Sequence, residues 1–357
     1  MVKLGEQRKR NIALKRFRFF YQEIVWVFIL IFIFLLIPLF LVPLIIDETS
    51  PLYGVLFYLL RAIFVLIGVP LVYPLANLIF ESQKRNIIME EDISPAIGHL
   101  KLYKITKKNY KYQILYGILI FFLVFLPIDF FNYLLIPQMI EYQALTLSLK
   151  ATGAYFLSGN YFIFLISAIV IQFSVAIAEE TISRGFLTKR GSEHFFGISA
   201  VIIASFYWAL GHFAYFLDPI SRSFPPWYPF IWFLQAFVIG IILSLVVIRR
   251  KWLIPVIIAH TLNNLISAQV VWSFWQGSNF IVVALYLYYP LFIIGCGLIV
   301  WYYSLIKDSL SIGFKMLKTY FKPDETSERT KGDVIFRIFF DLFIGLFIFL
   351  MGFMIAI

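Results

Sequence analysis

The chain has 357 residues, of which 61% are hydrophobic and 20% aromatic, and its mean hydropathy is +0.87. This composition excludes an ordinary soluble domain and predicts a polytopic membrane protein embedded in a lipid bilayer. The net charge of +10 does not indicate a nucleic-acid partner, because Lys and Arg lie in short segments between apolar runs. The single cysteine, Cys296, excludes an intramolecular disulfide framework and a cysteine-based zinc site.

Nine apolar runs are long enough to cross a bilayer, since a spanning helix needs about 20 apolar residues. We expect helices at about residues 22–46, 52–80, 112–139, 155–184, 196–217, 228–248, 252–273, 279–306 and 334–356. The first run is too long for a signal peptide and lacks a cleavage pattern, so we expect it to be retained. The predicted fold class is therefore an all-α polytopic membrane helix bundle with eight or nine transmembrane helices.

Every second connection between these helices is rich in positive charge, which places the positive charge at one side of the membrane. Basic connections at the N-terminus and at residues 84–111, 189–190, 249–251 and 307–331 alternate with connections that carry few positive charges, at residues 47–51, 141–153, 218–227 and 276–279. The positive-inside rule predicts an integral protein of the cell membrane with a cytoplasmic N-terminus and an external C-terminus. Only the longer connections, 81–111 and 307–333, leave room for amphipathic segments at the interface.

The most informative charges are Glu179, Glu180 and Arg184, at the end of the fourth apolar run. An ionisable side chain in hydrocarbon costs several kcal/mol, so such a cluster indicates a functional site. Residues four apart share a helical face, so we expect Arg184 to pair with Glu180 as structural support. Glu179 points about 100° away and has Ser183 at the corresponding position, which leaves its carboxylate free for chemistry.

Three further polar residues stand on neighbouring predicted helices: His212 on the fifth, and His260 with Asn264 on the seventh. A lone histidine is more often a packing residue, and Asn264 could bond across helices, as we expect of Asn263. Together with Glu179, however, two imidazoles and an amide can activate water and stabilise an oxyanion. We therefore predict one shared catalytic site.

Other polar residues receive no role in this site. His99 and His194 lie in predicted loops. Arg61, Asp129 and Asp341 are charges in or near apolar runs, where they can pair with other helices, snorkel or mark a helix break. These three are the leading further candidates for a role in the site.

Three motifs together resemble a known family. They are Glu179-Glu180-x-x-x-Arg184, Trp208-x-x-x-His212 and His260-x-x-x-Asn264. In this order, each on its own predicted helix, they resemble the signature of the CAAX prenyl protease and bacteriocin-processing family of intramembrane proteases, also called abortive-infection-like. The resemblance covers about residues 155–270. Trp208 is a conservative departure, since phenylalanine is usual at this position.

The resemblance implies an intramembrane endopeptidase with the CAAX-protease fold. Glu179 with His212 would activate water, and His260 with Asn264 would form the oxyanion hole. The substrate would be a peptide or a prenylated protein in the membrane, cleaved near the cytoplasmic side without a cofactor. Residues 1–154 would supply three spans and a cytoplasmic loop, residues 155–270 the catalytic core, and residues 271–357 the C-terminal helices with a second cytoplasmic loop.

The expected helix ends leave a geometric tension between the motifs. At about 1.5 Å per residue, Glu179 lies about a turn and a half from the inner end of its helix, whereas His212 lies roughly 20–25 Å along the next one. The site then requires tilted helices, an interfacial segment at residues 194–199, or different helix boundaries.

Three alternatives remain open. Two histidines and a glutamate can also ligate zinc, although no His-Glu-x-x-His is present and a glutamate paired with arginine is a poor ligand. A transporter could use the same charges, but we find no internal repeat or paired broken helices. A non-catalytic immunity or scaffold protein could retain the fold, against which the intact motifs argue.

Overall fold

The computed structural model describes residues 2–79, 94–323 and 328–356, and within these ranges the regular structure is helical, with no strand. The described residues include nine helical segments long and apolar enough to cross a membrane. The predicted all-α polytopic fold is confirmed, and the chain is an integral multi-pass membrane protein. The segments are Gly5–Ile45, Pro51–Leu75, Tyr110–Leu135, Tyr161–His194, Gly197–Leu217, Trp227–Arg250, Ile254–Trp275, Phe280–Trp301 and Lys331–Phe353.

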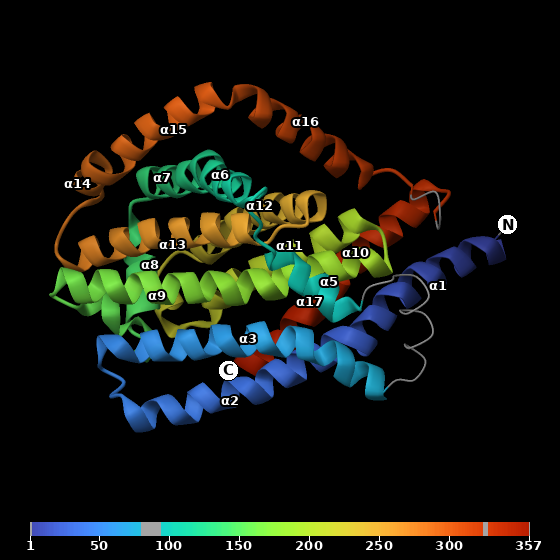
Figure 1. Cartoon of the computed structure of the whole chain (residues 1–357), viewed down its shortest axis with the longest axis horizontal. Coiled ribbons are helices and arrows are strands. Elements are labelled where there is room, and N and C mark those ends of the chain that lie inside the picture. The colour runs from blue at the N-terminus through green and yellow to red at the C-terminus, as the bar shows by residue number, and fades with distance from the viewer. Residues whose placement is uncertain (1, 80–93, 324–327, 357) are drawn as a thin grey trace.

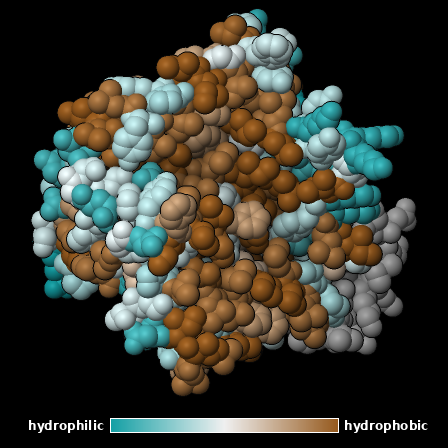
Figure 2. Space-filling model, turned by 60° about the vertical axis from the view of Figure 1, so that its left-hand side comes forward, coloured by the Kyte–Doolittle hydropathy of each residue, from teal (hydrophilic) through white to brown (hydrophobic). Residues whose placement is uncertain are grey.

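The outer surface has the character expected of a lipid-facing protein. Figure 2 shows a broad hydrophobic band between hydrophilic residues at its left and right edges. Large apolar side chains such as Leu44, Phe162 and Ile293 are exposed along the spanning helices. In a bilayer such exposure is favourable, whereas the backbone polar groups must be satisfied within each helix.

The helix that carries Glu179 and Glu180 lies in the middle of the bundle (Figure 1). This helix, α9 (Tyr161–Glu180), packs against α3 (Pro51–Ile79) and α13 (Ile254–Trp275), while α2 (Val25–Ile45) packs on α3. On another side, α11 (Gly197–Phe213) packs against both α12 (Trp227–Arg250) and α17 (Lys331–Ala356). The remaining segments, with η for 3₁₀ or π turns, are α1 (Val2–Phe19), η1 (Phe20–Ile24), α5 (Pro95–Leu100), η2 (Lys101–Tyr103), α6 (Tyr110–Ile120), η3 (Phe121–Phe125), α7 (Leu126–Leu135), α8 (Gln138–Ser148), η4 (Ala151–Leu157), η5 (Thr181–Thr188), α10 (Lys189–His194), η6 (Ala214–Leu217), η7 (Pro219–Ser223), α14 (Phe280–Val283), η8 (Ala284–Tyr288), α15 (Tyr289–Trp301) and α16 (Tyr303–Thr319).

The start of α9 differs from the sequence prediction, which placed a helix from residue 155. Residues Ala151–Leu157 form the separate 3₁₀ turn η4, and α9 begins at Tyr161. The reason is a helix cap: the Asn160 side chain accepts hydrogen bonds from the backbone N–H groups of Phe162 and Ile163.

The end of this helix also differs from the prediction, which ended it at residue 184 and placed a turn at residues 189–190. The helix continues through the π-helical segment η5 into α10, as far as His194. Here the charges do not end the helix because they find partners: Arg190 Nη2 lies 2.7 Å from Glu23 Oε1. The assignment of His194 and His99 to loops is likewise wrong, since they lie in α10 and α5.

The connection at residues 307–333 contains an amphipathic helix, α16, as the sequence allowed. Residues 80–93, in the predicted basic connection at 81–111, lie outside the described residues. The described basic connections lie toward the right-hand end of Figure 1, near α1, α5 and α10. The connections poor in positive charge, such as that between α2 and α3, lie at the opposite end. This charge asymmetry is the basis on which the N-terminus is predicted to be cytoplasmic.

Candidate intramembrane active site

A helical hairpin brings the first two motifs to the same level. From Glu179 the continuous helix runs about 15 residues to His194, and after a short turn α11 returns about 15 residues from Gly197 to His212. Both arms are therefore roughly 20 Å long. Because the two arms are equally long, Glu179 and His212 lie at the same depth in the membrane. The predicted difference in depth arose because the sequence prediction ended the first helix ten residues too early.

Glu179 is held by Trp208 and faces His260. The Trp208 indole Nε1 donates a 2.6 Å hydrogen bond to Glu179 Oε2, and His260 Nε2 lies 4.0 Å from the same oxygen. About 30% of the Glu179 side chain is accessible. The carboxylate is thus oriented by a neighbour and still open to a reactant.

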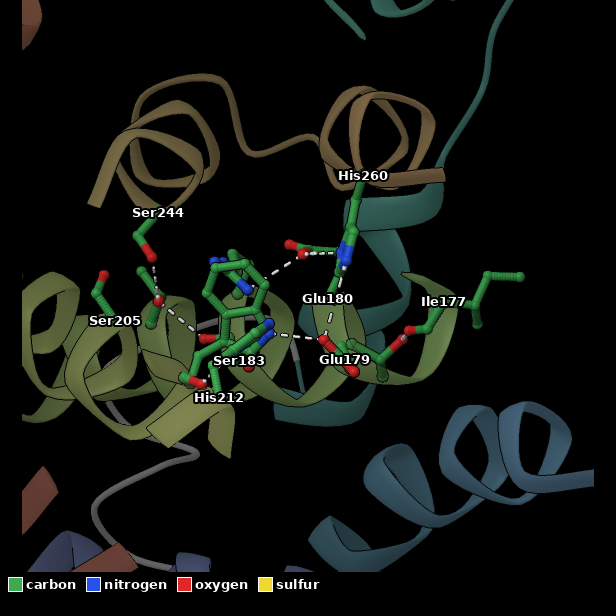
Figure 3. A network of polar contacts seen from close by, with 12 residues as sticks. Ile177, Glu179, Glu180, Ser183, Ser205, His212, Ser244 and His260 are labelled. Carbon is green, nitrogen blue, oxygen red and sulfur yellow. Dashed lines mark hydrogen bonds and ion pairs between the residues drawn. The ribbon is translucent and has the colours of Figure 1, made fainter. Parts of the chain in front are cut away.

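Glu180 positions His260 as well as Arg184. Its Oε1 lies 3.1 Å from Arg184 Nη1, so the expected ion pair is present. The same oxygen accepts a 2.8 Å hydrogen bond from His260 Nδ1, a contact that sequence reasoning missed. Figure 3 shows Glu179 and Glu180 both directed toward His260. Glu180 and Arg184 are fully buried, so this support is shielded from water.

The local backbone and the Trp208 ring complete this arrangement. The π-helical segment η5 begins directly after Glu180, and π turns inside helices occur frequently at functional sites. The Arg184 guanidinium lies 4.2 Å from the Trp208 ring centroid, within the range of a cation–π interaction. Trp208 also contacts both candidate histidines edge-on, with ring centroids 4.8 Å from His212 and 5.6 Å from His260.

His212 has a defined tautomer in its neutral state. Its Nδ1 lies 3.1 Å from the Trp208 carbonyl oxygen, and because a carbonyl can only accept, Nδ1 carries the proton. The other nitrogen, Nε2, then has a free lone pair and can accept a proton. The ring is held between Trp208 and Trp232, with the Trp232 centroid 5.5 Å away.

Two cavities meet at these residues. The smaller has a volume of about 290 Å³ and is lined by Glu179, His212, His260 and Asn264. The larger, of about 650 Å³, shares Glu179 and His212 with the first. The structure thus brings all four predicted catalytic residues to one connected space, in which Glu179 is accessible.

The residues that sequence reasoning left without a role divide between the cavities and the bundle. Arg61 lines both cavities, and Asp129, hydrogen-bonded by Ser267, lines the smaller one. Asp341 is elsewhere, 2.6 Å from Arg16 Nε. The sequence could indicate a role for Arg61 and Asp129, since each is a charge in an apolar run. That they line the cavities could not be predicted, because it depends on how the helices pack.

Both cavities extend toward the end of the bundle that is poor in positive charge. Lys150 and Thr152, which lie between α8 and α9, line both of them, and Asp218 lines the larger one. None of the described basic connections contributes a lining residue. Glu179 itself stands about 27 Å along α9 from that end, so the space leads deep into the membrane.

Metal ligation receives no specific geometric support. Within residues 2–79, 94–323 and 328–356, no three or more His, Cys, Asp or Glu side chains are grouped so that they could hold a metal ion. His260 Nδ1 is occupied by Glu180. The zinc alternative stays a prediction that chelation would test.

Fold and site together define a class: a polytopic membrane protein with a carboxylate–imidazole site inside its helix bundle. Residues 158–266 match the model of a family described as type II CAAX prenyl endopeptidase Rce1-like. The resemblance predicted from the motifs is therefore confirmed over α9 to α13, which is less than a third of the chain. The match suggests a CAAX-type intramembrane protease and hence a hydrolase. Comparisons with curated proteins and with solved structures gave no match.

From the sequence, Trp208 was interpreted as a conservative replacement of the usual phenylalanine. In the structure its indole forms a specific hydrogen bond with Glu179. Phenylalanine, usual at this position, cannot donate the hydrogen bond that the indole gives Glu179. The unusual tryptophan was the only feature of the sequence that could have indicated this contact. Its partner, Glu179, follows only from the way α11 packs relative to α9.

Proposed function

We propose that the chain is a glutamate-type intramembrane endopeptidase that hydrolyses a peptide bond of a membrane-associated peptide or prenylated protein. The observation that carries this proposal is the accessible Glu179 carboxylate with His260 Nε2 4.0 Å away, at the junction of two cavities. The larger cavity has a volume that suits an apolar chain, which supports a lipidated or strongly hydrophobic substrate.

Glu179 and His212 would activate the attacking water. A water bound at the Glu179 carboxylate would lose a proton to this base as its oxygen attacks the substrate carbonyl. His212, with Nε2 as a proton acceptor, would orient that water or relay the proton. The bond to the leaving amine then breaks as the amine nitrogen receives a proton from the same groups.

His260 and Asn264 would stabilise the oxyanion that forms in this step. The Glu180 carboxylate accepts a hydrogen bond from His260 Nδ1, so His260 would donate to the oxyanion from Nε2 with a proton on each ring nitrogen. Asn264 lines the same cavity and carries an amide donor. The loss of one such donor typically costs about 10²–10³ in turnover.

Substitution of Glu179 tests the proposal directly. Membranes from cells that produce the wild type or Glu179→Gln should be compared by proteomics of peptide termini. We expect at least one terminus that forms only with the wild type, because glutamine has nearly the same shape but cannot act as a base. That terminus would also identify the substrate.

The matched control is Glu141→Gln, the same substitution on an exposed position of α8. This variant should give the same termini as the wild type. If Glu179→Gln and the wild type gave identical termini at equal amounts of folded protein, hydrolysis by this site would be refuted.

The orientation and the membrane form part of the proposal. We infer a cytoplasmic N-terminus in the cell membrane, because almost all described basic connections lie at one end of the bundle. Fusion of a reporter that is active on only one side of the membrane to either terminus would test this.

A further inference from the structure

Arg61 is a cation inside the membrane-spanning part of α3. It lies about ten residues from the start of this helix at Pro51, or roughly 15 Å, which is near the middle of a bilayer core about 30 Å thick. An arginine at this depth costs several kcal/mol and typically faces an aqueous cavity or a functional partner. Arg61 therefore calls for a physical explanation.

Among the residues that the structure describes, Arg61 forms no hydrogen bond or ion pair. It is half-buried and lines both the smaller and the larger cavity, where Glu179 is also found. Glu179, Tyr207 and Tyr215 line the larger cavity together with Arg61. Arg184, the other arginine near the site, is by contrast held by Glu180.

The surroundings of Arg61 differ between the two cavities. The smaller cavity contains amide and hydroxyl groups, including those of Gln143, Asn263 and Ser267. One wall of the larger cavity consists of apolar side chains of α2 and α17, and its other lining residues include the charged Lys150, Glu179 and Asp218. The apolar side chains are Phe32, Leu35, Leu36, Leu39, Phe349 and Phe353. A molecule with an apolar chain and an anionic end could fill the larger cavity and place its charge at Arg61.

We propose that Arg61 binds a carboxylate of the apolar substrate and so determines which substrates the site accepts. This inference deepens the proposed function of the same site. A guanidinium stays charged at any working pH, and its planar fork fits a carboxylate through two parallel hydrogen bonds. A phosphate monoester carries more charge than a carboxylate and would be repelled more strongly by Glu179 across the same cavity.

Binding of a simple probe tests Arg61 without requiring cleavage. The purified full-length protein in nanodiscs of zwitterionic lipid should be titrated with fluorescent N-dodecanoyl-leucine and with its carboxamide. The two probes differ only at the carboxyl group. We expect the acid to bind about tenfold more tightly or better, since hydrogen bonds to charged groups are roughly twice as strong as neutral ones.

Arg61→Gln should bring the two probe affinities to about the same value. Arg61→Lys should retain part of the preference, because it keeps the charge and loses the planar fork. Arg222→Gln is the matched control: it is the same substitution on an exposed residue of η7 that lines neither cavity, and it should keep the full preference. Thermal unfolding would check that each variant is folded.

Several results would overturn the inference. They are equal binding of acid and amide by the wild type, an unchanged preference in Arg61→Gln, or loss of the preference in nanodiscs that contain anionic phospholipid, which would make a lipid phosphate the occupant. If Arg61 were only a counter-ion for Glu179, its loss would alter the pH profile of cleavage and leave the acid preference intact.

The failure of this inference and of the proposed function can be separated. Termini that depend on Glu179, together with no acid preference, would refute the role of Arg61 alone. An acid preference that depends on Arg61, with no Glu179-dependent terminus, would support an anion site and refute the hydrolase.

Discussion

Two of the buried charge networks in the described part of this helix bundle differ in which of their polar groups lack partners or are accessible. The end network, formed by Arg16, Ser199, Tyr320 and Asp341, ties α1, α11 and α17 together: Arg16 Nε lies 2.6 Å from Asp341 Oδ1, and Tyr320 donates to Asp341 Oδ2 at 3.1 Å. The cavity network comprises Glu179, Glu180, Arg184, Trp208 and His260.

In the end network both carboxylate oxygens of Asp341 have partners, and Asp341 is fully buried. In the cavity network Glu180 Oε2 has no partner among the described residues, and Glu179 is partly accessible. An unsatisfied buried carboxylate oxygen is costly, so its retention in the residue next to the accessible Glu179 favours a functional site. Burial of charge alone would not have separated a structural site from a functional one.

Among the substitutions that compare the two networks, Glu180→Gln should have the largest effect, because it changes both turnover and stability. Glu180→Gln leaves Arg184 buried without its carboxylate and deprives His260 of its charged partner. We expect turnover to fall by about 10²–10³, as for loss of an oxyanion donor, and unfolding in detergent to become about 3–5 kcal/mol easier. The rate of formation of the wild-type terminus and an unfolding titration measure the two effects.

A compensating variant separates the two effects. Adding Arg184→Met to Glu180→Gln removes the uncompensated cation and should restore part of the stability without restoring turnover. Wild-type turnover in Glu180→Gln would show that the cavity network is only structural, like the end network.

The end network should respond in stability alone. Asp341→Asn leaves Arg16 buried without its carboxylate, so we expect a loss of about 3–5 kcal/mol in the free energy of unfolding. Turnover per folded molecule should stay near the wild-type value, because Asp341 lines neither cavity. A large drop in that turnover would mean that the two networks are coupled.

Trp208→Phe tests whether the hydrogen bond from Trp208 orients the Glu179 carboxylate for catalysis. Phenylalanine keeps an aromatic ring beside Arg184 but cannot donate to Glu179. A hydrogen bond to a charged group is worth about 1.5–3 kcal/mol, so we expect turnover to fall by roughly 10- to 100-fold if the bond orients Glu179. An altered pH profile, with unchanged thermal stability, would support orientation. Unchanged turnover would contradict it.

The smallest effect concerns His99, which lies outside the membrane-spanning segments and packs against Gly185 of η5. Burial lowers the pKa of His99 to about 4, from an ordinary value of 6.5. Between these values the unfolded chain binds a proton that the folded chain does not, so stability falls as the pH is lowered from about 6.5 to 4. At pH 5 the loss should be about 2 kcal/mol relative to neutral pH.

Thermal unfolding at pH 7.5 and pH 5.0 measures this effect. His99→Gln should show a weaker loss between the two pH values, since glutamine does not titrate. An equal loss in the variant and the wild type would show that other groups cause it. The end network and the cavity network can be compared in the same experiment through Asp341→Asn and Glu180→Gln.

The sequence by itself determined that the protein is a polytopic membrane protein, and it selected four residues, Glu179, His212, His260 and Asn264, that line one cavity. Apolar runs of about 20 residues predict spanning helices because a bilayer has a fixed thickness, and the described residues contain the nine candidate spans that the sequence predicts. The spacing of Glu180 and Arg184 predicts a shared helical face, and the two side chains are in contact. Both are short-range properties that need no knowledge of neighbouring helices.

Only the tertiary structure decided how these residues divide their tasks. The continuation of the helix to His194 sets the level at which Trp208 meets Glu179, and the packing of α13 on α9 places His260 between the two glutamates. The place of Arg61 at the cavities depends on how α3 packs against α9. Contacts between helices distant in sequence depend on packing and on where each helix begins and ends, which local patterns do not encode.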